Sequence, residues 1–146
     1  GVDISRRFFK HWYSGLFPIE LVNHLENNMV FPNALEFINT VYGSPNPNKI
    51  LASYCAEIAC LLEFDPVRRL VQQAFHDYFD YYRLVFLQHK DMPIAFSGSV
   101  ASGFKDILLA VAKSRGHKVF AVIDNPIKSL VAYHMSDYLE SSSNSF

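Results

Sequence analysis

The chain has few of the residues that build disulfide frameworks or metal sites. Two cysteines among 146 residues, Cys55 and Cys60, lie five positions apart on different faces of a predicted helix, at a poor distance for a disulfide. We therefore expect both to be buried free thiols. The six histidines form no H-x-x-x-H pair and have no nearby cysteine at zinc spacing, so we expect no metal site.

Neither sign of charge dominates the sequence. Thirteen basic and fourteen acidic residues give a formal charge of -1, and no basic run follows one face. This balance argues against nucleic acid as a partner. The apolar stretches are broken before the roughly 18 residues that a membrane span needs, and no signal-peptide pattern opens the chain, so we expect no membrane association and a cytoplasmic location.

Hydrophobic residues are abundant, at 50% of the chain, so one domain can bury a sizeable core. Pro18 and Pro32 stand where prolines open helices, and Gly15 ends a first helical pattern, which predicts three short helices over residues 3–42. The residues that recur at helical spacing before Gly15 are Ile4, Phe8, His11 and Trp12.

Two further helices follow the turn-rich stretch YGSPNPNK. The stretch KILASYCAEIACLLE predicts one helix, with Leu51, Cys55, Ile58 and Leu62 on one face. Asp65 is then expected to cap the next helix and Pro66 to open it, with an apolar stripe that runs from Val67 to Phe86 and is buried on more than one side. We interpret its aromatic run FHDYFDYY as core packing, since no basic residues interleave to favour base stacking.

From residue 93 the pattern predicts strand, helix, strand, helix. PIAFS and KVFAVI are short apolar runs, and the helix between them ends at Gly116, which gives two parallel strands with a right-handed crossover. Asn125 and Pro126 open the last helix, with Ile127, Leu130, Val131 and His134 on one face. We thus divide the chain into a helical segment (1–92), a βαβα unit of the same domain (93–139) and a flexible tail (140–146).

Such a sheet is incomplete. Two parallel strands beside five helices leave unpaired edges, whereas parallel sheets normally have more strands and both faces covered. We therefore expect an α/β fold whose missing strands come from another part of a longer protein or from a dimer mate. The start at Gly1, directly before a predicted helix, favours a fragment.

The loop in PIAFSGSVASGFKD is the strongest candidate for a ligand site. Gly98 and Gly103 are spaced as in a P-loop, but Phe104 stands where the lysine should be, and Lys105 is turned by about 100° around the helix. The G-x-S-x-G elbow and the G-x-G-x-x-G fingerprint also fail. Two interpretations remain open: the small residues admit a flat or phosphorylated ligand, or Gly98 only makes a tight turn.

Four ordered blocks carry a family resemblance: YGSPNPNKILASYCAEI, DPVRRLVQQAFHDYF, PIAFSGSVASGFKDILLAVAKSRG and NPIKSLVAYH. Over residues 1–134 the chain resembles the C-terminal half of BadF/BadG-type ATPases, in particular the N-acetylglucosamine kinase-like members. The resemblance implies a helix-rich part of a ribonuclease-H-like, actin-like ATPase domain. It also implies that Gly98, Ser99 and Val100 line the nucleoside site of ATP.

The same resemblance implies a function for the parent protein, which would phosphorylate an amino sugar with ATP and Mg²⁺. The phosphate loops, the catalytic aspartate and the sugar site belong to an N-terminal domain that this sequence lacks, so the resemblance implies no catalytic residue here and no activity of the isolated chain. Lys49 either reaches the nucleotide or is simply solvated. The alternatives are a non-catalytic helical interaction or regulatory module, and an activator-type ATPase subunit, although Cys55 and Cys60 are not arranged as cluster ligands.

Overall fold

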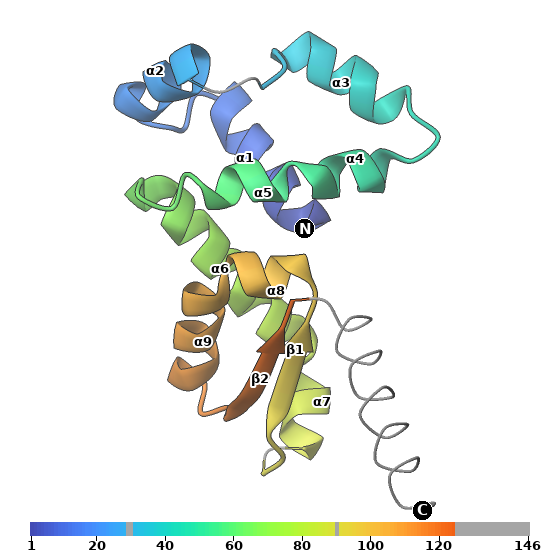
Figure 1. Cartoon of the computed structure of the whole chain (residues 1–146), viewed down its shortest axis with the longest axis vertical. Coiled ribbons are helices and arrows are strands. Elements are labelled where there is room, and N and C mark those ends of the chain that lie inside the picture. Colours follow the sequence, from blue (N-terminus) through green and yellow to red (C-terminus); the bar gives the residue numbers. More distant parts are fainter. Residues whose placement is uncertain (29–30, 90, 125–146) are drawn as a thin grey trace, which may run out of the picture. The chain divides into compact units, whose positions relative to one another are not determined.

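The computed structural model describes residues 1–28, 31–89 and 91–124 and divides into two compact units (Figure 1). The first unit, Gly1–Gln88, is helical, and the second begins at His89 and contains the strands. The predicted last helix after Asn125 and the predicted tail lie outside the described residues. None of the helices that are described combines the length and apolarity of a bilayer-spanning segment.

The helices predicted over residues 3–42 are confirmed, and more helices follow them. Gly15 has a φ of 68°, a left-handed conformation that suits glycine and stops the first helix. Pro32 does not open the third helix, because the helix is capped by Asn33 and starts at Ala34. The helices of the first unit are α1 (Val2–Tyr13), α2 (Ile19–Asn28), α3 (Ala34–Tyr42), α4 (Pro47–Ser53), α5 (Cys55–Ala59), α6 (Asp65–Tyr81) and α7 (Arg83–Gln88).

The single helix predicted from KILASYCAEIACLLE is wrong, since α4 and α5 are separated at Tyr54 and α5 ends before Cys60. Tyr54 has a ψ of -8°, far from the α-helical value, yet Leu51, Cys55 and Ile58 are buried on both sides of this turn, as predicted. The burial departs from the prediction only after the end of α5, where Leu61 is buried and Leu62, which the pattern placed in the core, is only half-buried. Cys55 is buried as expected, whereas Cys60 is exposed, which corrects the expectation of two buried thiols.

Helix α6 starts one residue earlier than predicted. Asp65 is its first residue, Phe64 occupies the capping position, and no side chain caps the helix. The apolar stripe is buried at Val67, Leu70, Val71, Ala74, Phe75 and Phe79. The helix ends at Tyr81, and the prediction is wrong for Tyr78, Tyr82 and Val85, which are exposed. Phe86 is half-buried, and its ring lies 4.9 Å from that of Phe79.

Helix α1 lies at the centre of the first unit, where it contacts α4, α5 and α6. Phe8 and Phe9 are almost fully buried, and their rings contact each other edge to face at 5.5 Å. Arg7 on the same helix pairs with Asp3 at 2.8 Å and with Asp77 of α6 at 2.7 Å. The two helices are therefore joined by apolar packing and by one ion pair.

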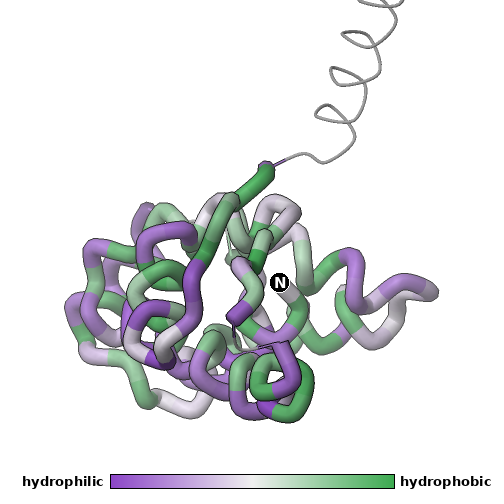
Figure 2. Tube along the Cα trace, turned by 90° about the horizontal axis from the view of Figure 1, so that it is seen from below, coloured by the Kyte–Doolittle hydropathy of each residue, from purple (hydrophilic) through white to green (hydrophobic). Residues whose placement is uncertain are grey.

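The second unit is a βαβ unit, as predicted. Strands β1 (Ile94–Ser97) and β2 (Val119–Ile123) pair in parallel, and α8 (Ser99–Gly103) and α9 (Lys105–Ser114) connect them. The end of β2 is green, and thus hydrophobic, in Figure 2, and only the last described residue after it is purple. The described part of the chain is thus mostly helical with one small two-stranded parallel sheet, whose outer edges have no strand partner among the described residues.

Candidate functional site

The turn between β1 and α8 has a backbone that only glycine adopts readily. Gly98 has φ 109° and ψ 164°, and a Cβ atom built there would meet nothing within 4 Å. Its amide donates to the carbonyl of Ile123 at 2.8 Å, and its carbonyl accepts from the amide of Ser102 at 3.1 Å. Gly98 thus makes the tight turn that the sequence predicted, and no atom of the described residues stands where its side chain would be.

Three residues with small side chains follow Gly98 and begin α8. The backbone amides of Ser99, Val100 and Ala101 have no hydrogen-bond partner within the described part of the chain, and no side chain caps this helix. Ser99 is exposed, Val100 is half-buried and Ala101 is buried. These unpaired donors lie at the carboxyl end of β1, the edge of a parallel sheet where ligands commonly bind.

Phe104 shows why the loop is no P-loop. Its side chain is only 1% exposed and belongs to the core of the second unit, together with Leu108 and Val111. The small-residue loop predicted before Phe104 contains a short helix, α8, which Phe104, with φ -116° and ψ 27°, separates from the predicted helix α9. Lys105 and Asp106 follow in the first turn of α9 and are exposed.

Lys49 is the fourth residue that the sequence proposed for a site. It lies in the first turn of α4, its side chain is exposed, and its amide donates to the carbonyl of Asn46 at 3.1 Å. Lys49 belongs to the first unit and Gly98 to the second. The nucleotide role of Lys49 stays a prediction, as do the roles of Gly98, Ser99 and Val100.

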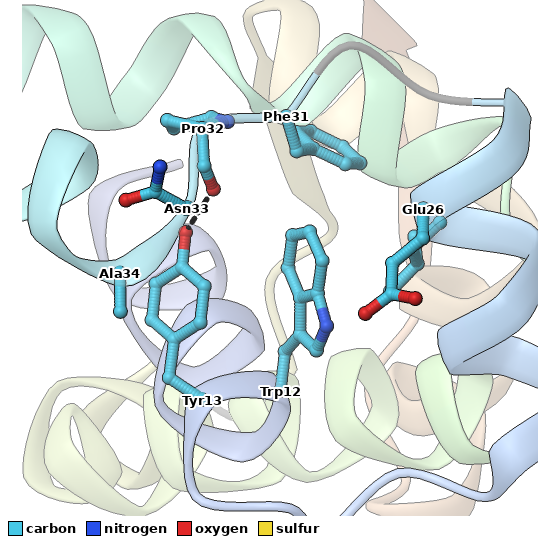
Figure 3. Close-up of a pocket in the computed structure, with 8 residues that line it drawn as sticks. Trp12, Tyr13, Glu26, Phe31, Pro32, Asn33 and Ala34 are labelled. Carbon is cyan, nitrogen blue, oxygen red and sulfur yellow. Dashed lines mark hydrogen bonds between the residues drawn. The ribbon is translucent and has the colours of Figure 1, made fainter.

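A cavity of about 320 Å³, which was not predicted from the sequence, lies in the first unit. It is formed by the end of α1, the end of α2 and the segment that enters α3 (Figure 3). Its lining residues are Trp12, Tyr13, Leu25, Glu26, Phe31, Pro32, Asn33 and Ala34. Sequence periodicity assigned Trp12 to a helix face but does not bring together residues from three separate segments.

Hydrogen bonding and stacking fix the aromatic wall of this cavity. The Tyr13 hydroxyl donates to the carbonyl of Pro32 at 2.6 Å. Burial, and then the nearby Tyr54 and Glu36, raise the pKa of the Tyr13 phenol well above its ordinary value, which keeps it a donor. The Tyr13 and Trp12 rings stack with centroids 5.1 Å apart.

No group of three or more His, Cys, Asp or Glu side chains is placed to hold a metal ion in the described ranges. The two cysteines also differ in exposure, since Cys55 is buried and Cys60 is exposed.

Comparison with solved structures identifies a relative of known architecture. A crystal structure of the putative N-acetylglucosamine kinase from Porphyromonas gingivalis matches 94% of this chain with a TM-score of 0.78 and 29% sequence identity. The predicted family resemblance is confirmed. The chain spans about half of that structure, 48% of its length, which fits a C-terminal portion. No family model matches the chain, and no curated protein matches it.

Proposed function

We propose that this chain is the C-terminal, nucleotide-side portion of an ATP-dependent amino-sugar kinase that acts on N-acetylglucosamine. The observation that carries the proposal is the structural similarity to the kinase-like protein from Porphyromonas gingivalis over nearly the whole chain. The two-stranded sheet supports it, because a parallel sheet of this size calls for further strands. In this proposal the N-terminal part of the same protein supplies those strands and completes an actin-like fold.

The second unit forms the adenosine side of the ATP site in this proposal. Gly98, Ser99 and Val100 present a small, open surface with unpaired amides at the carboxyl end of β1. A flat nucleoside can approach such a surface closely, because no bulky side chain among the described residues stands in front of Gly98. Lys49 is proposed as a further residue that contacts the nucleotide.

The remaining parts of the reaction fall to the N-terminal portion. Phosphoryl transfer needs loops that hold the phosphates, carboxylates that hold Mg²⁺ and a base for the sugar hydroxyl. The buried aromatic at Phe104 leaves α8 without the P-loop lysine that would hold phosphates. The isolated chain is therefore expected to be inactive, with the amino sugar bound by the other portion.

A non-catalytic interaction module is the second candidate, and one observation favours it. Leu35, Ile38 and Tyr42 on the outer face of α3 are 68%, 51% and 73% exposed, which gives an apolar stripe of the kind that binds partner chains. An activator-type ATPase subunit has less support, since the exposed Cys60 and the buried Cys55 do not form a cluster site.

A phosphotransfer assay separates these candidates. The full-length protein that contains this chain is supplied with ATP, Mg²⁺ and either N-acetylglucosamine, glucosamine or glucose. We expect ADP and sugar phosphate to form in equal amounts with the amino sugars, and no turnover by the isolated 146-residue chain. Absence of turnover with every amino sugar would contradict the kinase proposal and favour the interaction module.

A further inference from the structure

We propose that the cavity at the end of α1 binds one neutral saccharide ring, at a site that is distinct from the nucleotide surface around Gly98. The inference rests on the residues of the first unit alone and does not depend on kinase activity. Three observations on the described residues carry it. An aromatic wall is held in place by its neighbours, the half-buried Trp12 and the exposed Glu26 have polar groups that face each other without protein partners, and the lining contains no cationic side chain.

The aromatic wall is rigid and apolar. Trp12 is held on one side by the stacked Tyr13 ring and is met by Phe31 at a centroid distance of 5.8 Å and an interplanar angle of 68°. Tyr13 is itself fixed by its hydrogen bond to Pro32. The C–H face of a pyranose ring is apolar, and a preformed aromatic surface of this kind offers it contact at little cost in conformational entropy.

Two polar groups face one another across the open side of the cavity. In Figure 3 the indole nitrogen of Trp12 lies on the side of Glu26, and the Glu26 carboxylate points back toward the indole. Among the described residues neither the Trp12 Nε1–H nor the Glu26 carboxylate has a hydrogen-bond or ion-pair partner. The indole N–H is only a hydrogen-bond donor, and the carboxylate is only an acceptor.

A hydroxyl group of a ligand can form hydrogen bonds with both of these protein groups. It accepts from the Trp12 Nε1–H through its oxygen and donates its own hydrogen to the Glu26 carboxylate, so both protein groups are satisfied by one ligand atom. Sugars carry several such hydroxyls at the edge of an apolar ring. The remaining polar lining residue, Asn33, uses its side-chain oxygen to cap α3.

Charge argues against other ligand classes. Among the residues that the structure describes, the cavity is lined by one carboxylate and by no lysine, arginine or histidine, so this lining repels phosphates and carboxylates. A quaternary ammonium ion would be drawn to Glu26 and to the ring faces, but it would leave the Trp12 N–H without an acceptor. The volume of about 320 Å³ is at the lower end of the range for small-molecule sites, which suits a single ring.

The chain carries its own reporter, because Trp12 is its only tryptophan. In the ¹⁵N-labelled 146-residue chain, the one indole N–H resonance is followed while methyl β-glucoside, N-acetylglucosamine or tetramethylammonium is added without ATP. We expect a saturable shift with the two sugars, with a Kd on the order of 1 mM for ligands of this size. Failure of kinase turnover would leave this result unaffected.

Two variants on α2 test the role of the carboxylate. Glu26→Gln should weaken sugar binding about fivefold, since a charged acceptor is replaced by a neutral one. Glu20→Gln, an exposed glutamate on the same helix that does not line the cavity, is the matched control and should bind as the unaltered chain does. A shift that does not saturate, equal Kd values for Glu26→Gln and the unaltered chain, or a saturable shift with tetramethylammonium but not with sugars would overturn the proposal.

Discussion

Arg7 connects two helices of the first unit through one ion pair. Its guanidinium contacts Asp77 of α6 at 2.7 Å, and Asp77 also accepts a hydrogen bond from Gln73 at 2.8 Å. The Gln73 bond, and then the Arg7 bond, lower the pKa of the Asp77 carboxyl below its ordinary value. A carboxylate whose pKa is lower in the folded chain stabilises the fold above its unfolded pKa of about 4.

Replacing Asp77 with asparagine should therefore cost stability in a pH-dependent way. At pH 7 we expect Asp77→Asn to lower the free energy of unfolding by about 0.5 kcal/mol, the usual size for a partly exposed pair. The difference should shrink below about pH 4 and vanish once the folded carboxyl is protonated. Urea titrations at several pH values measure this difference. The control is Glu63→Gln, because Glu63 is exposed and has no ion-pair partner among the described residues. A constant difference at all pH values would contradict the ion-pair explanation.

Gly98 and Phe104 show how far single residues could be interpreted from the sequence. The bulky residue at position 104 excluded a P-loop, and the structure explains it as a core side chain. Glycine at position 98 left a turn and a ligand surface equally open, because both need a residue without Cβ. The backbone conformation confirms the turn. The nucleotide role stays a prediction, because the other parts of the proposed ATP site belong to a portion of the protein outside this sequence.

At the scale of the elements, local signals located the helices but not their ends. Helices α1, α2 and α3 and the βαβ unit follow from periodicity and turn residues. The break at Tyr54 was not predicted, because no glycine or proline stands there and so slight a turn leaves the spacing of the apolar residues almost unchanged. The cavity at Trp12 was missed for a similar reason, since it depends on the tertiary meeting of three segments.

Helix α3 is fixed at its start by a capping box. The Asn33 side chain accepts from the amides of Leu35 and Glu36, and the Glu36 carboxylate accepts from the amide of Asn33 at 3.1 Å. These bonds satisfy donors that a helix start otherwise leaves free. The cap also holds the segment of Phe31 and Pro32 that lines the cavity.

Asn33→Ala should consequently lower the free energy of unfolding by about 1 kcal/mol, the usual cost of a lost N-cap. Asn39→Ala, an exposed position within the same helix, is the control and should leave stability unchanged or slightly raised, since alanine favours helix. Chemical denaturation of the two variants provides the comparison. Equal stability of Asn33→Ala and the unaltered chain would show that the cap contributes nothing.

At the scale of the whole molecule, the two units have different parts in the proposed kinase. The first unit is a helical body around α1 with its own cavity, and the second is a βαβ unit whose sheet edges are unpaired in the described residues. The chain spans about half of the kinase-like structure that it resembles. The sequence predicted this incompleteness from strand count alone, because two parallel strands do not make a covered sheet.

In the proposed kinase the turn after β1 forms the nucleoside side of the ATP site, and this role can be tested directly. Gly98→Ala tests it in the full-length protein that contains this chain, with Gly116→Ala as the matched control. Both glycines have positive φ values, 109° and 78°, and neither would crowd a neighbour with its Cβ, so both variants strain the backbone of the second unit.

The measurement is the pair of KM values for ATP and for N-acetylglucosamine in each variant. We predict that Gly98→Ala raises the KM for ATP about tenfold, equivalent to about 1.4 kcal/mol, and leaves the KM for the sugar unchanged. Gly116→Ala should change neither KM. An equal rise in both KM values, or the same effect in both variants, would contradict the account and leave Gly98 as a turn residue alone.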